Sequence, residues 1–385
     1  LNIRLTKLSI IIPTINEMMV LPDLLQQLNR QQQIQLEIII ADGGSTDDTL
    51  RLELAENTQL IHTKKGRGHQ MNQAASQAQF DLLLFIHADS KIQSNTLLYD
   101  ATELFIQILD QLSSQQLAGH FKLKFDRQDE KNQTAYSYYE SKTALNRAEC
   151  TNGDQGLLIT KTFFNQLGGF DEQLHFLEDQ RLAEKIRKQG TWITLPGTLI
   201  TSARRFEEEG FVRRMILSAF IMNYNYIGYQ DFFTHAPGVY KQQDVTQSLD
   251  IYAYFNLIHQ LNKKTPLLKL AKRWIATGNY TKIHCWQLFF FWDVKLNYFK
   301  AELNSSSART KLIPLLDKAE LSGSVRFNDN LSTTVDKKSK TPFLNFYDKI
   351  FSHIINFYLF DLVCTALVYG WFHLSRIRYW FSKHF

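Results

Sequence analysis

Two polar groups follow the most apolar run in the first part of the chain. Residues 82–86 are all hydrophobic, and His87-Ala88-Asp89 comes directly after them. A short apolar run bounded by polar residues is typical of a strand buried on both faces of a sheet. Ligands of open α/β sheets bind just beyond the carboxyl ends of such strands. A carboxylate there, beside phosphate groups, suits a hard divalent cation, so Asp89 is a candidate metal ligand.

Three more apolar runs end in polar loops of the same kind. Strands are predicted at 8–12, 36–41, 60–62 and 82–86, and the loops after them carry Glu17, Asp42, Arg67 and Asp89. Helical spacing between the runs predicts an α/β fold with a mostly parallel sheet. Parallel strands end at one edge, so these loops should form one site. The glycine pattern is neither GxGxxG nor GxxxxGK[ST], which counts against dinucleotide and P-loop enzymes.

The periodicity predicts further elements along the first part of the chain. Helices are expected from Asn16-Glu17 through Leu28, after a cap at Thr46 or Asp47, and at 70–78, 95–111 and 177–188. Strands are expected at 118–125, 157–159 and 192–195. The polar segment 126–149, with its tyrosine cluster, is interpreted as a helix and a mobile loop near a substrate.

Charge and aromatic content divide the 385 residues into two parts. Residues 1–240 carry 23 Lys and Arg against 28 Asp and Glu, whereas residues 241–385 carry 20 against 10 and hold five of the six Trp. We therefore expect a catalytic domain at 1–240 and an aromatic, basic, mainly helical region at 241–385, with different partners. The three cysteines show no CxxC spacing, which indicates reduced thiols in a reducing compartment. The first residues lack the apolar core of a secretory signal.

A series of ordered motifs carries a family resemblance over roughly residues 8–230. The series is IIPTINE, ADGGSTDDT, KKGRGHQMNQA, LLFIHADS, NGDQG, LGGFDE, LEDQRLAEKIRKQG and TSARRF. It resembles the family 2 glycosyltransferases with the GT-A fold, which is a Rossmann-like, mostly parallel sheet with helices on both faces. GRGHQMN, FIHAD, GDQG and SARRF look like a bacterial branch of that family. The resemblance implies transfer of a sugar, with inversion, from a nucleotide-diphosphate sugar to an acceptor hydroxyl.

The resemblance also implies which residues bind the donor. The positions for the base and ribose are Pro13, Thr14, Asn16, Glu17, Asp42 and Gly43, and those for the diphosphate are Lys65, Gly66 and Arg67. Two of these have plain structural alternatives. Glu17 is also an ordinary acid of a first helical turn, and Arg67 also suits a solvated basic loop.

His87 and Asp89 fill the Asp-x-Asp position of the family. Asp89 would bind Mg²⁺ or Mn²⁺ and neutralise the leaving nucleotide diphosphate. His87 departs from the usual first Asp and is assigned to the ribose or to support of the metal site; its alternative is a satisfied histidine at a strand end. Arg205 would reach the diphosphate, although Ser202 and Phe206 depart from the Gln and Trp of many relatives.

The catalytic base is assigned by the same resemblance. Asp179 matches the family's general base, which removes the proton of the acceptor hydroxyl, and a helix N-terminus would keep it ionised. The alternative role is a helix cap. Glu178 is expected to orient or contact the acceptor, and Asp154 to contact the acceptor or position a loop. No nucleic-acid partner is expected.

The C-terminal part lies largely outside the resemblance. Helices are expected at 251–261, 267–275 and 285–303, and polar loops or disorder at 304–310 and 323–340. Residues 354–374 are the most apolar stretch, with Asp361 near the middle. This stretch either spans a membrane, packs as a core or partner helix, or lies at a membrane surface. The basic, aromatic composition suggests a peripheral position at the cytoplasmic face of an anionic membrane, where a lipid-linked acceptor could be presented.

Two other functions remain open. One is a nucleotidyltransferase on a similar sheet, although the glycine- and lysine-rich nucleotide loop that it requires near the N-terminus is missing. The other is a catalytically lapsed module that binds a membrane or a partner through its aromatic tail. Donor hydrolysis would distinguish an enzyme from such a module.

Overall fold

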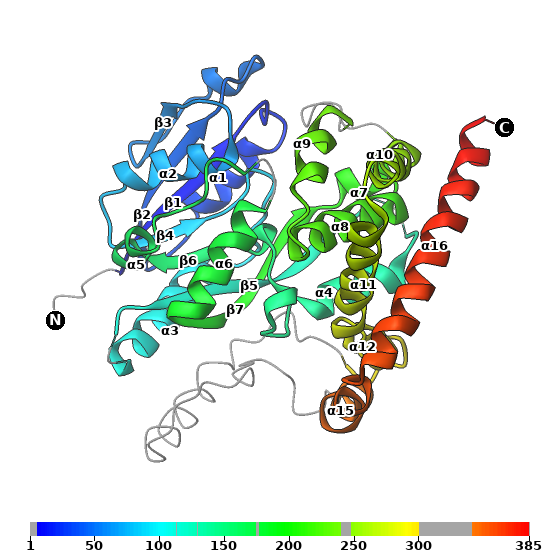
Figure 1. The fold of residues 1–385 in the computed structure, drawn as a ribbon. Coiled ribbons are helices and arrows are strands. Elements are labelled where there is room, and N and C mark those ends of the chain that lie inside the picture. Colours follow the sequence, from blue (N-terminus) through cyan, green and yellow to red (C-terminus); the bar gives the residue numbers. More distant parts are fainter. Residues whose placement is uncertain are drawn as a thin grey trace. The chain divides into compact units, whose positions relative to one another are not determined.

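The computed structural model describes residues 6–384 except 113, 129, 175–176, 240–247 and 300–340. These residues form two compact units (Figure 1). We call them the sheet unit, described over 6–127 and 135–202, and the helical unit, described over 128, 130–134, 203–239, 248–299 and 341–384. The domain boundary expected near residue 240 lies outside the described residues and stays a prediction.

Strands and helices alternate through the sheet unit. Its elements are β1 (Thr6–Thr14), α1 (Leu21–Asn29), β2 (Ile34–Asp42), η1 (Asp48–Arg51), β3 (Thr58–His62), α2 (Arg67–Gln77), β4 (Leu82–Phe85), α3 (Leu97–Gln111), β5 (Leu117–Asp126), α4 (Gln133–Lys142), η2 (Ala148–Cys150), η3 (Gly153–Gln155), β6 (Leu157–Thr160), α5 (Lys161–Gln166), α6 (Glu178–Gln189) and β7 (Thr191–Ser202).

The strands form one seven-stranded sheet in the order β3-β2-β1-β4-β6-β5-β7. All neighbours are parallel except β6, which runs antiparallel to both β4 and β5. The predicted fold class is confirmed as far as the architecture goes: a mostly parallel α/β sheet with helices on both faces, followed by a largely helical region.

Both faces of the sheet are buried because adjacent strand residues point to opposite sides. Ile11, Ile39 and Phe85 belong to a hydrophobic cluster with residues of α2, α5 and α6. Their neighbours Ile10 and Ile38 are equally buried and point to the other side, where α3 contacts β1, β5 and β7. This two-sided burial explains why the strands read as continuous apolar runs.

Three elements differ from the sequence-based expectation. The helix expected to open at Asn16-Glu17 begins only at Leu21, and Asn16 itself adopts a left-handed conformation at φ 54°. The helix expected after Gly43-Gly44 is only the short 3₁₀ turn η1, with Asp47 as its cap. The side chains of Asp47 and Thr49 hold the backbone amides of Met18 and Glu17, so this segment serves as a loop clamp rather than a helix start. The strand expected at 192–195 continues to Ser202, because a register irregularity opposite β5 accommodates Pro196 and Gly197.

The helical unit contains the remaining elements. They are α7 (Arg204–Glu209), α8 (Phe211–Tyr226), α9 (Gln230–Val239), α10 (Ile251–Lys263), α11 (Leu267–Ile283), α12 (Trp286–Lys295), α14 (Pro342–Phe346), the π-helical turn η5 (Tyr347–Phe351), α15 (Ser352–Ile355) and α16 (Tyr358–His384). The helices expected at 251–261 and 267–275 are confirmed. The helix expected at 285–303 ends at Lys295, and Asn297 adopts a left-handed conformation at φ 57°. The polar segments 304–310 and 323–340 lie outside the described residues.

The apolar stretch 354–374 is not one continuous helix. It begins in α15, breaks, and continues in α16. Within the described part of the chain, no single helix meets the length and hydropathy expected of a membrane span. The segments Pro342–Ile355 and Tyr358–Lys383 meet it only as a pair that is bent by 102°.

Candidate active site

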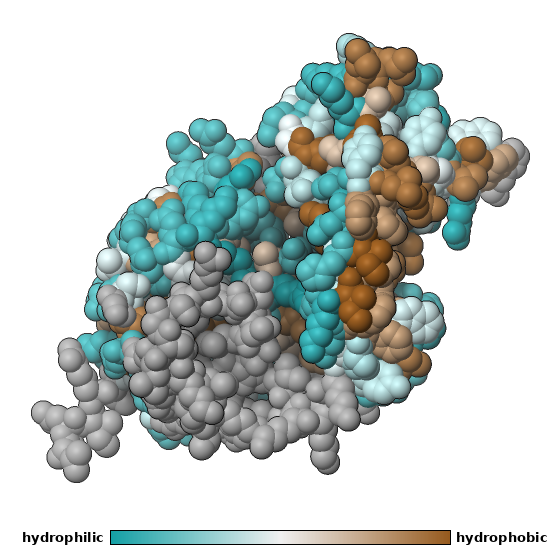
Figure 2. All heavy atoms as spheres, turned by 60° about the horizontal axis from the view of Figure 1, so that its bottom comes forward, coloured by the Kyte–Doolittle hydropathy of each residue, from teal (hydrophilic) through white to brown (hydrophobic). Residues whose placement is uncertain are grey.

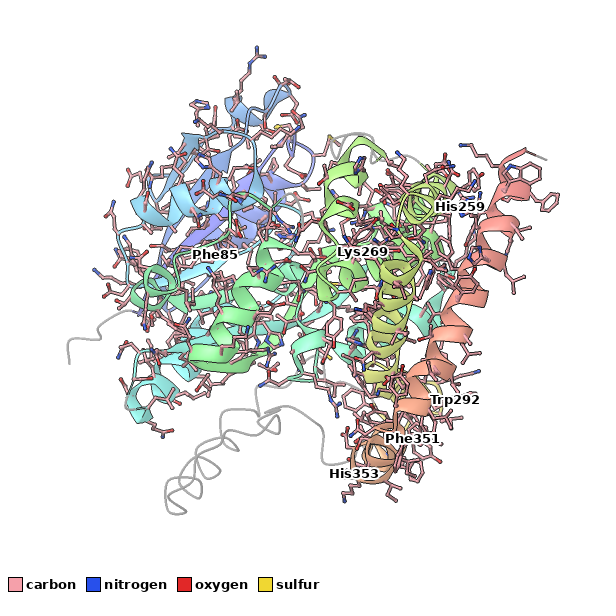
Figure 3. The ribbon with its side chains drawn as sticks, viewed as in Figure 1. Phe85, His259, Lys269, Trp292, Phe351 and His353 are labelled. Atoms are coloured by element: carbon pink, nitrogen blue, oxygen red, sulfur yellow. The ribbon has the colours of Figure 1, made fainter. Side chains whose placement is uncertain are left out.

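The loops singled out in the sequence meet at one edge of the sheet unit. Thr14 of β1 pairs with Asp42 of β2, and Asp42 pairs with His62 of β3, so the three parallel strands end level with one another. β4 runs parallel beside β1 and ends at Phe85, which Figure 3 labels. The predicted clustering of the Glu17, Asp42, Arg67 and Asp89 loops at this edge therefore follows from the strand directions.

The first two loops are clamped to each other. The Asn16 side-chain oxygen accepts hydrogen bonds from the amides of Thr46, at 2.7 Å, and Asp47, at 3.3 Å. The Asn16 amide donates to the Ser45 hydroxyl at 2.8 Å. Asp42 is fully buried, and its carboxylate accepts from the amides of Gly44 and Ser45 at 2.8 and 3.0 Å and from the Ser45 hydroxyl. Asn16 and Asp42 thus shape the wall of the proposed donor site.

Gln70 supports this wall and was missed as a site residue. Its side-chain amide donates to the carbonyl oxygens of Thr14 and Ala41, at 3.0 and 2.7 Å, and the residue is 2% exposed. The bonds tie the first turns of α2 to the carboxyl ends of β1 and β2. A Cβ on Gly43 would lie 2.9 Å from the Gln70 side chain, so that position has little room for a larger residue. A buried polar residue in the quoted motif GRGHQMN was the available signal.

Arg67, the first residue of α2, lies at the centre of a charged cluster. Its guanidinium forms ion pairs with Glu178 and, at 3.7 Å, with Asp179, both in the first turn of α6. Burial alone would lower the pKa of Arg67, but Glu178 and Asp179 together raise it by more than burial lowers it. The net shift is upward, so Arg67 stays positively charged. Glu178 is almost fully buried and Arg67 is 40% exposed. In this arrangement Glu178 positions Arg67, while the guanidinium stays open to an anionic ligand.

His87 extends the charged cluster. Its Nδ1 lies 2.9 Å from the Asp154 carboxylate, and its Nε2 lies 3.4 Å from Arg67. Burial, and to a lesser extent Arg67, lower the pKa of His87, but Asp154 and Asp89 together raise it, so the net shift is upward. Asp154, which is expected to contact the acceptor or to position a loop, contacts His87 and is 40% exposed.

Asp179 is held by backbone amides at the start of α6. One carboxylate oxygen accepts from the Gly153 amide at 2.9 Å and the other from the Gln180 amide at 2.7 Å, and its side chain is 23% exposed. A Cβ on Gly153 would lie 2.5 Å from the Asp179 carboxylate, so glycine allows the close approach. Gly153 was quoted within NGDQG but not assigned a role. A fixed, partly exposed carboxylate is suited to accept a proton.

The remaining predicted site residues are distributed as follows. Pro13 and Thr14 are the last two residues of β1, and Glu17 is half-buried in the next loop. Lys65 is exposed, and Gly66 is the N-cap of α2 at φ 144°. Arg205 lies on α7 of the helical unit and is exposed, so its role toward the diphosphate stays a prediction.

The protein's own residues offer only part of a metal site. Among the described residues, no three His, Cys, Asp or Glu side chains are grouped so that they could hold an ion. Asp89 is half-buried in the turn after β4. Mg²⁺ is commonly held by one or two carboxylates together with substrate phosphates. The metal-ligating side chains among the described residues therefore fit a cation that binds together with a diphosphate. They do not fit a cation held by these side chains alone.

A pocket opens between the charged cluster and the core of the sheet unit. Its polar side is lined by Arg67, His87, Asp179 and Gln180, and its apolar side by Met71, Phe85, Leu157, Phe170, Ala183 and Trp192. A concave, mostly apolar site with a few convergent polar groups and perturbed pKa values is the usual form of a small-molecule site.

Comparison with known proteins agrees with this geometry. Residues 9–157 match the model of Glycosyl transferase family 2. A PGL/p-HBAD biosynthesis glycosyltransferase of Mycobacterium bovis is 39% identical over 92 residues, which is 22% of this chain and 36% of that protein. The poly(ribitol-phosphate) beta-N-acetylglucosaminyltransferase TarS of Staphylococcus aureus is 33% identical over 100 residues, 24% of this chain and 18% of TarS. The match thus spans about a third or less of these relatives.

Solved structures of TarS are also similar. Residues 1–349 of S. aureus TarS in complex with UDP align with 85% of this chain and 89% of that one, at 18% identity and a TM-score of 0.42. The assignment rests on the family model, whose matched segment contains the strands, loops and charged residues of the site except those of α6 and α7. Residues 9–157, which are less than half of this chain, therefore match the model of Glycosyl transferase family 2.

Proposed function

We propose that this protein is an inverting glycosyltransferase that uses a nucleotide-diphosphate sugar. The observation that carries the proposal is the pairing of Asp179 with Arg67. A fixed carboxylate and a permanent cation lie 3.7 Å apart and line one pocket, at the edge of the sheet where open α/β sheets bind their ligands. Group transfer from a diphosphate needs both a proton acceptor and a positive charge opposite the leaving group.

In the proposed step, Asp179 accepts the proton of the acceptor hydroxyl. The acceptor oxygen forms a bond to the anomeric carbon from the side opposite the diphosphate, while the bond between that carbon and the diphosphate oxygen breaks. The bonding electrons leave with the diphosphate, so its negative charge increases. Arg67 and His87, which lie 3.4 Å apart, would stabilise this charge.

The proposal includes a divalent cation that binds together with the nucleotide-sugar donor. Asp89 is the protein ligand that we assign to it, and Mg²⁺ or Mn²⁺ would supply further charge neutralisation at the diphosphate. The UDP and UDP-GlcNAc complexes of TarS support a nucleotide-sugar donor for this chain as well. The lipid-linked acceptor and the location at the cytoplasmic face of a membrane are also part of the proposal.

A two-stage measurement tests this function. Thermal unfolding is followed with UDP-, GDP- and dTDP-sugars in the presence of Mn²⁺, because a ligand that binds only the folded state raises the melting temperature. The stabilising donor is then incubated with the protein, and release of the nucleoside diphosphate is measured. A donor that stabilises and is turned over supports the proposal. Absence of both stabilisation and turnover with every donor would leave a binding module as the better description.

A further inference from the structure

One face of α16 is apolar along its whole length and is open to solvent. Seven residues spaced three or four apart share this face, and we call them the outer stripe: Leu359, Val363, Leu367, Gly370, Leu374, Ile377 and Phe381. The leucines at 359, 367 and 374 are 68%, 67% and 70% exposed. A surface helix of a globular protein normally turns polar side chains outward.

The opposite face of α16 already has its partners inside the helical unit. Cys364 and Phe372 are buried there, and the helix contacts α10 and α11. Asp361, the acid that interrupts the apolar sequence, points to this inner face and pairs with Lys282 of α11 at 2.6 Å. The only acid of α16 is thus turned away from the outer stripe.

The apolar surface continues around the bend that precedes α16. Phe346, Ile350, Ile354 and Phe357 are between 45% and 68% exposed, and so is Leu288 of α12 at 66%. Trp292 and Phe351 lie at this end of α16 (Figure 3). Figure 2 shows hydrophobic side chains gathered over this side of the helical unit. The combined surface is too extended to be a set of isolated exposed residues.

The charge of the segments that form this surface is mainly positive. Segments 248–299 and 341–384, which supply α10 to α16, carry eleven Lys and Arg against four Asp, a net +7. Asp361 pairs with Lys282, Asp250 pairs with Lys383 at 2.5 Å, and Asp293 is buried and accepts two backbone amides. Lys349 and Arg378 are exposed beside the bend and the outer stripe.

We infer that the outer stripe and the bend lie on an anionic lipid surface, with α16 in the plane of the interface. Apolar side chains would enter the boundary of the acyl chains, and the basic residues would contact the anionic headgroups. A second copy of the chain fits less well, because it would bring a second net positive surface against the first. The inference concerns the helical unit only and does not depend on the proposed enzymatic activity.

Vesicle binding tests this surface. The full chain is sedimented with anionic and with neutral phosphatidylcholine vesicles, at about 0.1 M and about 1 M salt, where the screening length falls from about 10 Å to about 3 Å. We expect binding that prefers anionic vesicles and weakens at high salt. The double substitution Leu367→Glu, Leu374→Glu should reduce partitioning by at least about tenfold, because it removes two exposed leucines and adds two negative charges.

Leu50→Glu is the matched control, since Leu50 is 42% exposed on η1 of the sheet unit. It should bind vesicles like the unmodified protein, and circular dichroism melts should show that all three proteins are folded. Equal vesicle binding by the double variant and the control would overturn the inference. It would also be overturned by a dimer in sedimentation velocity that the double substitution abolishes, without binding to either vesicle type. Loss of donor turnover with intact vesicle binding would affect only the proposed function.

Discussion

At the residue scale, the pairing of Arg67 with Glu178 and Asp179 is the main feature of the site. The guanidinium is partly exposed, whereas Glu178 beneath it is almost completely buried. A buried carboxylate with one cationic partner fixes that partner in place, since separating the pair would leave an uncompensated charge. Arg67 is therefore oriented before any donor binds, which is the arrangement that electrostatic stabilisation of a leaving group requires.

Asp179→Asn should retain donor affinity and lose transfer by about 10²–10⁴-fold. The amide keeps the size and polarity of the side chain but cannot take the proton of the acceptor. Donor binding is measured by calorimetry and transfer by release of the nucleoside diphosphate. Asp81→Asn, an exposed aspartate at the start of β4, is the control. Near-normal transfer by the Asp179 variant would move the base to Glu178 or Asp154.

Asp89→Ala should abolish the metal-dependent part of donor binding and leave the fold intact. Asp89 lies in the turn after β4 and not within the strand, so its removal does not alter the core. Calorimetric titration with a nucleoside diphosphate, with and without Mn²⁺, measures the difference. If Mn²⁺ enhances binding equally in the variant and the unmodified protein, Asp89 is not the metal ligand.

His120 should make the stability of the protein fall in acid. It is fully buried on β5, and its Nδ1 accepts the indole N–H of Trp192. Burial, together with the nearby Arg187, lowers the pKa of His120 to about 3. Between pH 6.5 and 3 the unfolded chain binds a proton that the folded protein does not, so the unfolding free energy decreases as the pH falls, by up to about 1.4 kcal/mol per unit.

The matched variant for this prediction is His120→Asn, whose side-chain oxygen can accept the Trp192 indole N–H but does not titrate. Urea unfolding between pH 7 and 4 is compared for the two proteins. We expect a shallower decline in the variant. If the unfolding free energy falls equally steeply with decreasing pH in both proteins, groups other than His120 cause the loss of stability in acid.

At the element scale, helix N-termini and strand ends supply the site. α2 contributes Arg67 as its first residue and holds the ends of β1 and β2 through Gln70. α6 contributes Glu178 and Asp179 in its first turn, where the helix dipole favours negative charge. Leu177, just before α6, adopts a left-handed conformation at φ 66°. Such a conformation is uncommon for leucine and is found most often where a functional geometry is enforced.

The Lys282–Asp361 ion pair joins α11 to α16 at 2.6 Å. Lys282→Met should destabilise the helical unit by about 3–5 kcal/mol, because it leaves the Asp361 carboxylate buried without its cation. The double variant Lys282→Met, Asp361→Leu should recover most of that loss, since both charges are removed together. Denaturant unfolding of the single and double variants measures the coupling. A double variant as unstable as the single one would show that the charge itself is not the cause.

At the scale of the whole molecule, the chain combines two units of different character. The sheet unit holds the charged site and most of the acidic residues, and the described C-terminal helices carry a net +7 with the outer stripe exposed. These differences agree with separate tasks for the two units: binding and transfer of a sugar in one, and attachment to an anionic surface in the other. Both tasks are proposals, and each has its own test.

The sequence by itself determined the elements of the sheet unit and the place of its site. Buried parallel strands must be apolar on both faces, so the runs at 8–12, 36–41 and 82–86 could be recognised as strands. Because parallel strands end at one edge, the loops after them had to converge. The ordered motifs identified the family, which the match over residues 9–157 bears out. These signals involve residues that are close together in the sequence, so they can be recognised without the tertiary structure.

Only the tertiary structure decided which side chains meet. Arg67 and Glu178 are 111 positions apart, and Gln70 reaches Thr14 across 56. No periodicity encodes such distances, because they depend on how α2 and α6 pack on the same face of the sheet. The same reason applies to α16. Its sequence has apolar residues on every side, and only the packing of α10 and α11 against one side determines that Asp361 is paired inside while the outer stripe remains open.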